Sequence, residues 1–173
     1  VQILGDLPIY VAPDSADVWE RPELFHVDSK VGEFSHVAGV PPDYFNADGQ
    51  YWGNPLYHWS AHQDEGYDWW IKRLESQLRL FDVVRIDHFR GFHDYWSIPK
   101  ETSDAKAGEW KDGPGIDFWE VVAKRFPSLP FLAEDLGLIT EGVRTLRRSV
   151  GLPGMAVLQF AFDGDAENLY LPH

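Results

Sequence analysis

Four short apolar runs alternate with segments of helical periodicity, and this alternation constrains the fold more than any other feature. The runs lie at 1–11, 83–89, 129–134 and 155–162. Apolar runs of this length predict buried strands, and such strands are typical of parallel sheets covered by helices on both faces. Strands that alternate with helices of 10–15 residues indicate βαβ units. The sequence therefore predicts an α/β fold with a parallel sheet.

Three helices are predicted, one before each of the last three apolar runs. Apolar residues recur at helical spacing in 67–81, 116–126 and 140–150. Thr140 is a suitable N-cap for the last helix, and Gly151 is a suitable stop. Four such βα units amount to half of a (β/α)8 barrel.

The segment 12–62 does not follow this alternation. It is rich in Pro, Gly, Asp and aromatic residues and has no sustained period. A structureless loop of that length is uncommon inside a compact domain. We therefore expect an irregular inserted subdomain on the active-site face of a partial barrel domain that spans 1–173.

Carboxylates stand at the ends of two predicted strands. Arg85 and Asp87 interrupt the run 83–89, and alternation along a strand places both on the same side. Glu134 ends the run 129–134 in the same way. A nearby guanidinium would lower the pKa of Asp87 and keep it ionised, as a carboxylate nucleophile requires. An ion pair that closes the barrel end is the alternative interpretation.

Separate strand ends that carry one carboxylate each are how a (β/α)8 barrel builds its active site. One ionised and one protonated carboxyl group can together cleave a glycosidic bond. If they lie about 5 Å apart, the reaction passes through a covalent glycosyl-enzyme and retains configuration. Glu134 would act first as the acid and then as the base. Asp135 competes for this role, but we expect it to cap a helix or bind loop amides.

Five runs resemble signatures of the 4-alpha-glucanotransferase family, the amylomaltases and disproportionating enzymes of glycoside hydrolase family 77. They are GDLPIYVAPDSADVW (5–19), AGVPPDYFNADGQYWGNPLY (38–57), VVRIDHFRGF (83–92), LAEDLG (132–137) and GLPGMAVLQFAFD (151–163). The resemblance implies that Asp87 is the nucleophile and Glu134 the general acid/base. It also implies a TIM barrel, of which this chain would hold about the third to sixth strands. The substrates would be maltooligosaccharides and α-1,4-glucans, with no cofactor.

The family's third catalytic carboxylate is an Asp in a His-Asp-Asn run, and this sequence contains no such run. The chain also begins at Val1 inside an apolar run. We expect an internal piece of a longer enzyme, inactive alone, that needs the rest of the parent domain to complete its barrel.

The run 41–57 combines turn signals with aromatic residues. It is either a satellite core pinned by prolines or a substrate-binding loop. The resemblance favours a loop over the glucan cleft, with Trp52 as a stacking platform. Such a lid would also expel water. The candidate contacts in this run are Asp43, Gln50, Trp52 and Asn54.

Further candidates for substrate contact come from the strand ends. Asp6 ends the first strand at LGD and either borders the cleft or serves a turn or cap, and Arg85 faces the same site. Phe160 lines the barrel mouth or packs in the core. Unless the strand has ended before it, His88 is expected to face a helix on the side opposite the nucleophile. Arg90 is expected to serve the loop or a neighbouring acid.

Composition excludes several classes of function. A net charge of −13 and a pI near 4.8 argue against binding nucleic acid or anionic membranes. No apolar stretch is long enough to span a bilayer. The absence of cysteine excludes disulfides and thiolate metal sites, and we expect no metal. The expected location is the cytoplasm, or a plastid in a plant.

The leading hypothesis is therefore a 4-alpha-glucanotransferase that transfers a glucan segment to the 4-hydroxyl of an acceptor through a glycosyl-Asp intermediate. A retaining hydrolase of the α-amylase type would use the same carboxylates with water as acceptor. A non-catalytic glucan-binding fragment is the alternative from another class.

Overall fold

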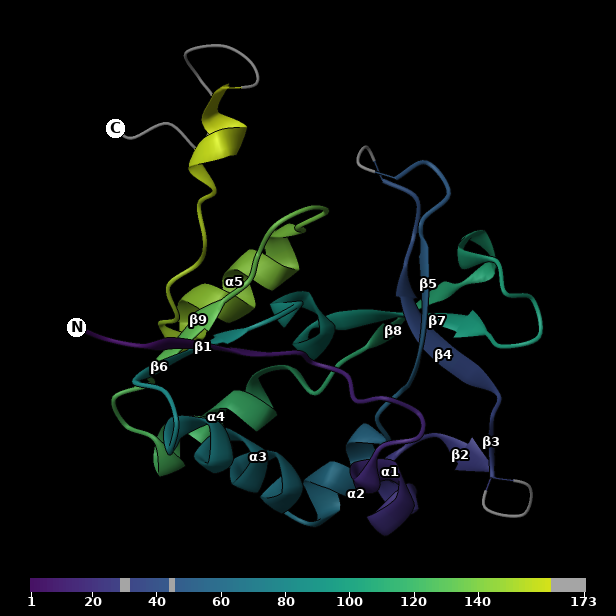
Figure 1. Ribbon diagram of the computed structural model, residues 1–173, viewed down its shortest axis with the longest axis horizontal. Helices are drawn as coiled ribbons and strands as arrows, with labels where there is room; N and C mark the ends of the chain where they lie inside the picture. The colour runs from purple at the N-terminus through teal and green to yellow at the C-terminus, as the bar shows by residue number, and fades with distance from the viewer. Residues whose placement is uncertain (29–31, 44–45, 163–173) are drawn as a thin grey trace.

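The computed structural model describes residues 1–28, 32–43 and 46–162. Two sheets lie beside each other in Figure 1, a three-stranded parallel sheet and a four-stranded antiparallel sheet. The larger of two hydrophobic clusters runs through the helical layer and into the link between the sheets, and a smaller one joins Val37, Ile98 and Ala105 at the antiparallel sheet.

The parallel sheet consists of β1 (Leu4–Leu7), β6 (Val83–Ile86) and β9 (Phe131–Ala133), in the order β1-β6-β9. These strands confirm three of the four predicted ones, with shorter bounds. The register places Asp6 beside Arg85, and Arg85 beside Leu132. The carboxyl ends of all three strands therefore meet at one edge.

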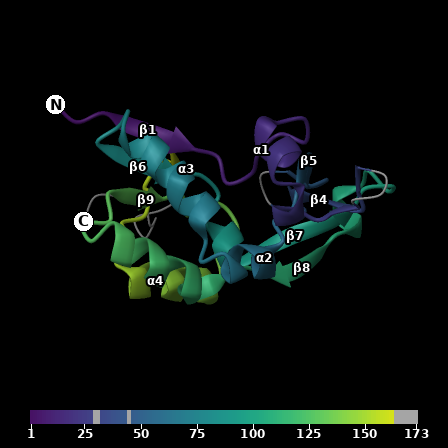
Figure 2. The same ribbon diagram turned by 90° about the horizontal axis from the view of Figure 1, so that it is seen from below.

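One face of this sheet is buried and the other is open. Val84 and Ile86 are fully buried, whereas the alternate residues Val83 and Arg85 stay partly exposed. In Figures 1 and 2 the helices α3 (Asp68–Leu78) and α4 (Gly115–Arg125) lie on the same side of the sheet. The site residues on alternate positions thus occupy the uncovered face.

The third predicted helix is α5 (Glu141–Val150). The Thr140 hydroxyl accepts a hydrogen bond from the Val143 N–H, and Gly151 ends the helix in the left-handed conformation with φ 80°. Both terminal signals read from the sequence are confirmed.

The prediction of a fourth strand at 155–162 is wrong. Residues 152–157 are irregular, and η4 (Leu158–Phe162) is a 3-10 helix that stands away from the sheet in Figure 1. The Phe160 N–H donates to the Val157 carbonyl (2.9 Å), which is a local bond of a tight turn. A short apolar run fits either structure, because periodicity alone does not distinguish them.

The region after β1 holds several short elements. They are α1 (Ala16–Glu20), η1 (Pro22–Leu24), β2 (Val27–Asp28), β3 (Glu33–Phe34), β4 (His36–Val40), β5 (Gln50–Pro55) and α2 (Trp59–Asp64). The expected irregular region therefore contains regular structure, including two strands of the antiparallel sheet.

The other two strands of that sheet come from a later part of the chain. They are β7 (Asp94–Pro99) and β8 (Glu109–Asp112), and the order is β5-β4-β7-β8. Two short 3-10 helices, η2 (Phe89–Phe92) and η3 (Ala105–Ala107), precede these strands. The sequence did not predict β7 and β8, because β7 pairs with the distant β4 and β8 pairs only with β7.

Buried aromatic residues hold the helical layer against η2. Phe92 stacks on Phe118 of α4, with ring centroids 4.8 Å apart and planes 15° apart. Trp70 of α3 meets both rings edge-on. Offset stacking and edge-to-face contacts stabilise such clusters beyond area burial. The segment that follows Asp87 is thus held firmly by the core.

Candidate active site

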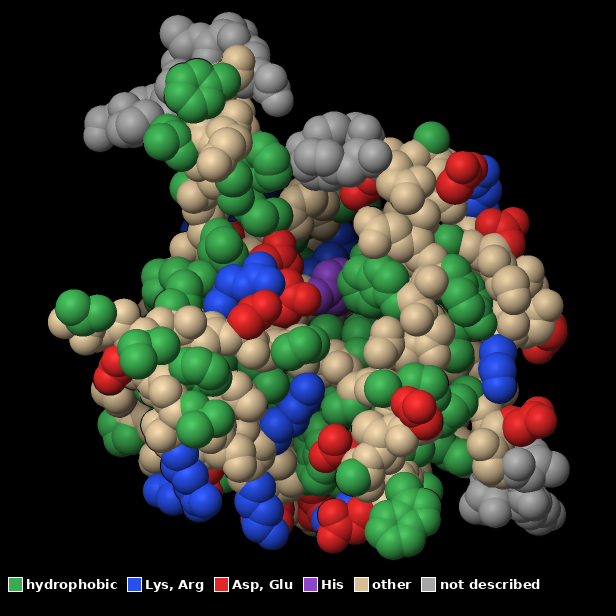
Figure 3. Space-filling view, viewed as in Figure 1, with side chains coloured by type: hydrophobic (Ala, Val, Ile, Leu, Met, Phe, Trp, Pro, Cys, Tyr) green, Lys and Arg blue, Asp and Glu red, His purple; other side chains and the backbone are tan. Residues whose placement is uncertain are grey.

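Arg85 joins two carboxylates at the carboxyl ends of β1 and β6. Its Nε and Nη2 donate to the two oxygens of Asp6 (2.8 and 3.0 Å), and Nη2 also lies 2.8 Å from Asp87 Oδ1. Figure 3 shows acidic and basic side chains gathered beside a histidine at the centre of this face of the molecule. The hydrogen bond with Asp6 and the charge of Asp87 raise the pKa of Arg85, although burial opposes them. The guanidinium therefore stays charged.

Asp87 has a pKa above its ordinary value, which corrects the expectation from sequence. Burial is the largest cause, and the charge of Asp6 adds to it. Arg85 does favour the ionised form, as expected, but its charge and hydrogen bond do not outweigh burial. The net effect of burial was not readable from the Arg85-Ile86-Asp87 spacing.

Glu134 is held by two backbone N–H groups. Its Oε2 accepts from His88 (2.9 Å) and its Oε1 accepts from Leu136 (2.8 Å). Burial raises the pKa of Glu134 and the charge of Asp87 adds to this, whereas the two N–H bonds and Arg85 lower it. A carboxyl group with a raised pKa suits a general acid. The expected separation of about 5 Å between the two carboxylates stays a prediction.

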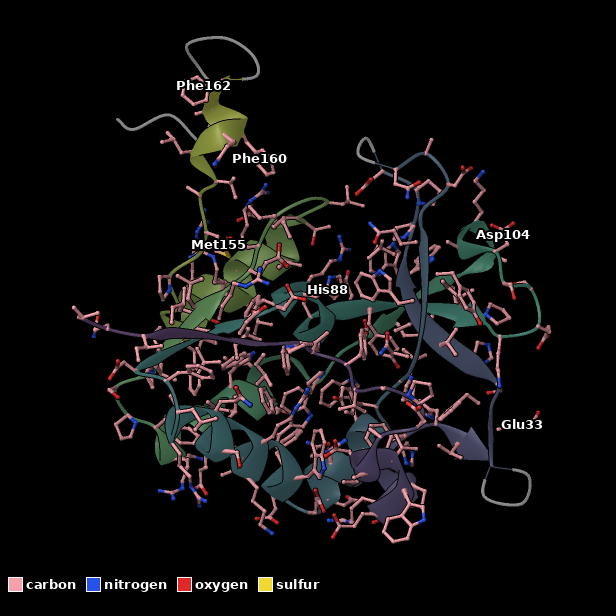
Figure 4. All side chains as sticks on the ribbon, in the orientation of Figure 1. Glu33, His88, Asp104, Met155, Phe160 and Phe162 are labelled. Carbon is pink, nitrogen blue, oxygen red and sulfur yellow. The ribbon has the colours of Figure 1, made fainter. Side chains whose placement is uncertain are left out.

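His88 lies on a different side from the one predicted. β6 ends at Ile86, and His88 adopts the left-handed conformation with φ 50° and ψ 50°. Its ring meets Trp52 edge-on at 4.9 Å between centroids, and Figure 4 labels it between the two sheets. Burial lowers the pKa of His88 to about 4, and the charge of Arg90 adds to this. The ring is therefore neutral near pH 7.

A hollow of about 270 Å³ opens beside Glu134. Its walls come from β4, β5, β8, η2, the loop after β9 and η4, and Figure 4 shows the lining residue Phe160 on η4. The predicted contacts among the lining residues are Asp43, Gln50, Trp52, Glu134 and Phe160. Asp6, Arg85, Asp87 and Asn54 are not among them.

Arg90 and Trp110 are among the lining residues that the sequence did not assign to the site. The guanidinium of Arg90, from η2, lies over the ring of Trp110, from β8, with the guanidinium carbon 3.7 Å from the ring centroid. Trp110 carries no signal in its local sequence, since only the pairing of β8 brings it to this place. The expectation that Arg90 serves a neighbouring acid is confirmed by its ion pair with Asp94.

The predicted contacts of the 41–57 run have distinct partners. The Trp52 indole N–H donates to the Gln50 side-chain oxygen (3.0 Å), and Asp43 Oδ1 accepts from the Asn46 N–H (2.8 Å). Asn54 donates its amide to the Val11 carbonyl (2.8 Å) and so fastens β5 to the segment after β1. Tyr44 and Phe45 lie outside the described residues.

Asp135 binds a loop amide, as predicted. Its Oδ1 accepts from the Met155 N–H (2.8 Å), and its Oδ2 lies 3.1 Å from Arg147 Nε on α5. A Cβ at Gly154 would come within 2.5 Å of this carboxylate, so glycine permits the close approach. Asp135 fixes the chain that places Met155 Sδ 3.9 Å from Arg85 Nη1.

His58 and His62 have a four-residue spacing found in metal-binding pairs, but His62 is buried with Nε2 3.1 Å from the Leu24 carbonyl oxygen. In the described part of the chain, no group of three or more His, Cys, Asp or Glu side chains is placed to hold a metal ion. None of the described helices is long and apolar enough to cross a membrane.

The family described as 4-alpha-glucanotransferase matches this sequence over residues 1–173. The chain belongs to the 4-alpha-glucanotransferase family. It is 54% identical over 173 residues to the 4-alpha-glucanotransferase of Thermus thermophilus, which matches 100% of this chain and 34% of the relative. It is 49% identical to the chloroplastic/amyloplastic 4-alpha-glucanotransferase of Arabidopsis thaliana, again over 100% of this chain and 30% of the relative.

Among solved structures, the chain is similar to the amylomaltase from Streptococcus agalactiae in complex with acarbose. The TM-score is 0.94 at 42% identity, and the match covers 100% of this chain and 35% of that one. Members of the 4-alpha-glucanotransferase family are thus its relatives in both sequence and structure. The chain spans about a third of the length of the curated relatives it matches.

Proposed function

We propose that the complete enzyme containing this chain is a retaining 4-alpha-glucanotransferase. The observation that carries this proposal is the placement of Asp87 and Glu134 after adjoining parallel strands, linked by the hydrogen bond from the His88 N–H to Glu134. Family membership supports the same activity.

In the first step, an Asp87 oxygen attacks the anomeric carbon of an α-1,4-glucan. The bond between that carbon and the glycosidic oxygen breaks, and Glu134 gives its proton to the leaving oxygen. Arg85, 2.8 Å from Asp87, favours the ionised form of the nucleophile, although burial has the larger effect on the pKa of Asp87. The products are a glycosyl ester on Asp87 and a shortened glucan.

In the second step, Glu134 removes the proton from the 4-hydroxyl of an acceptor glucan or glucose. The acceptor oxygen attacks the anomeric carbon, and the ester bond to Asp87 breaks. Both carboxyl groups return to their starting protonation states, and configuration is retained after two inversions. No redox or nucleotide cofactor enters this scheme.

Transfer requires that an acceptor sugar outcompete water. The hollow beside Glu134 has aromatic walls, Trp52, Trp110 and Phe160, that suit the apolar faces of sugar rings. Asp6, Asp43, Gln50 and Asn54 are proposed as polar contacts to the glucan. Sugar stacked in this space would exclude water from Glu134. A retaining hydrolase of the α-amylase type is the second candidate, because it would use the same two carboxylates.

We further propose that the parallel sheet is part of a (β/α)8 barrel, about its third to sixth strands by family resemblance. Strands of parallel sheets are normally covered on both faces. Here Leu4 is 57% exposed on the open face. The rest of the parent domain would cover that face and supply the third carboxylate. Residues 12–62 would form an inserted subdomain, joined by β7 and β8.

Maltotriose as sole substrate of the complete enzyme tests the function. Glucose together with a ladder of longer maltooligosaccharides is the expected result. Glucose and maltose without longer products would favour the hydrolase, and no products from folded enzyme would favour a non-catalytic glucan-binding protein. The proposed location is the cytoplasm, or a plastid in a plant.

A further inference from the structure

Arg90 is a buried cation with three different partners. It lies in η2 and is only 5% exposed. Its Nε and Nη2 donate to the two oxygens of Asp94 on β7 (2.8 and 3.0 Å), and its Nη1 donates to the Leu138 carbonyl. Trp110 of β8 stacks on the guanidinium. A planar guanidinium held at both edges and one face has little freedom to move.

Leu138 belongs to the loop that leaves β9. Residues 134–139 contain neither helix nor strand, and Gly137 adopts φ 79°. This loop supplies the Leu136 N–H that donates to Glu134 Oε1 (2.8 Å). Backbone bonds to Ile86 and Phe89 hold Glu134 itself, and side-chain contacts help to fix the loop beyond it.

We propose that Arg90 is a positioning residue that holds the 136–139 loop, so that the Leu136 N–H orients the Glu134 carboxyl group. The inference rests on the proposed function, in which Glu134 is the acid/base. Asp94 anchors Arg90 to the antiparallel sheet, and the Leu138 carbonyl connects it to the loop. The antiparallel sheet thereby contributes to catalysis without supplying a catalytic residue.

The proposal predicts a direction for the pH profile. The Leu136 N–H bond favours the ionised form of Glu134 and so lowers its pKa against the effect of burial. Loss of that bond would raise the pKa, so Glu134 would keep its proton to higher pH. The basic limb of kcat/KM, where the free enzyme's acid is lost, would move upward. A loss of folded protein would lower kcat/KM equally at all pH values.

The test uses the double variant Arg90→Met/Asp94→Asn in the complete enzyme. The change at Asp94 is included because loss of Arg90 alone would leave the Asp94 carboxylate buried without its ion-pair partner. The net charge of the protein stays the same. The matched control is Arg125→Met/Glu75→Gln, which removes an ion pair with a 2.7 Å hydrogen bond from Arg125 Nε on α4 to Glu75 Oε1 on α3. Arg90→Lys is a milder second variant that keeps the charge but not the bidentate geometry.

In the double variant we expect the basic limb to rise by about half a pH unit or more. We expect kcat/KM at neutral pH to fall by about 10-fold to 100-fold, because Glu134 is misplaced. Amides of 134–139 should exchange hydrogen faster, and Arg90→Lys should give smaller changes in the same directions. The control should match the wild type.

The proposal would be overturned if a folded Arg90 variant, double or single, kept the basic limb of kcat/KM at the wild-type pH and kept wild-type rates of hydrogen exchange in 134–139. If the wild-type enzyme shows no glucan transfer, the proposed function fails, and the exchange experiment alone then decides whether Arg90 holds the loop.

Discussion

The His88 N–H donates a hydrogen bond of 2.9 Å to Glu134 Oε2, so the residue that follows the proposed nucleophile orients the proposed acid/base. The left-handed conformation of His88 directs this N–H away from the β6 ladder. A residue other than glycine adopts this conformation at a cost, and such strain concentrates at functional sites. The two carboxylates are therefore coupled through one peptide group as well as through their charges.

Replacing Asp87 by Asn should abolish the first chemical step, because an amide is a poor nucleophile. We expect kcat to fall by about 10⁴-fold or more in the complete enzyme. The control is Asp68→Asn, which changes an exposed carboxylate paired with Lys72 on α3. Near-normal transfer rates in folded Asp87→Asn enzyme would refute the assignment.

Replacing Asp6 by Asn should shift the acidic limb of kcat/KM to lower pH. The pKa of Asp87 is raised mainly by burial and secondarily by the charge of Asp6. Without that charge the ionised form of Asp87 is favoured, so activity should persist to lower pH. The plateau should fall, because Arg85 loses one of its two bonds to residue 6 and the negative charge of its partner. An acidic limb that moves to higher pH would contradict this account.

Replacing Trp52 by Ala should raise the ratio of hydrolysis to transfer. Trp52 forms a wall of the hollow next to Glu134, and its loss would admit water where the acceptor sugar is proposed to stack. Glucose release and oligosaccharide growth from maltotriose give the two rates. Trp19→Ala removes a tryptophan that is 86% exposed on α1 and should leave the ratio unchanged.

Stability should decline as pH falls from about 6.5 to about 4. Burial lowers the pKa of both His62 and His88 from 6.5 to about 4. The unfolded chain therefore binds more protons than the folded one in this interval, so the stabilisation is present above pH 6.5 and lost towards pH 4. Denaturation midpoints measured across the interval would follow this slope, and His88→Gln should flatten it. An equal slope in the variant would exclude His88 as a source.

The parallel sheet and its helices were predictable because their signals are local. Apolar runs predicted β1, β6 and β9, and the caps of α5 were legible at Thr140 and Gly151. The run 155–162 misled for the same reason, since its composition fits a strand while its chain forms η4.

The rest of the site depends on contacts between distant segments. Trp110 reaches the hollow only because β8 pairs with β7, and Arg90 reaches the Leu138 carbonyl only through the loop after β9. The pKa of Asp87 depends on how much solvent the fold removes, which no spacing of residues records. Carboxylate positions were therefore readable from the sequence, whereas their environments were not.

The one-sided burial of the parallel sheet has a consequence for biogenesis. Val84 and Ile86 are fully enclosed by the segments described, whereas Leu4 and the charged residues of the site share the other surface. In the proposed barrel, the helical side could consolidate before the remaining strands arrive. The enzyme would then become active only late in folding. A folding intermediate that lacks the remaining strands would expose apolar surface around the charged residues and would be a substrate for chaperones.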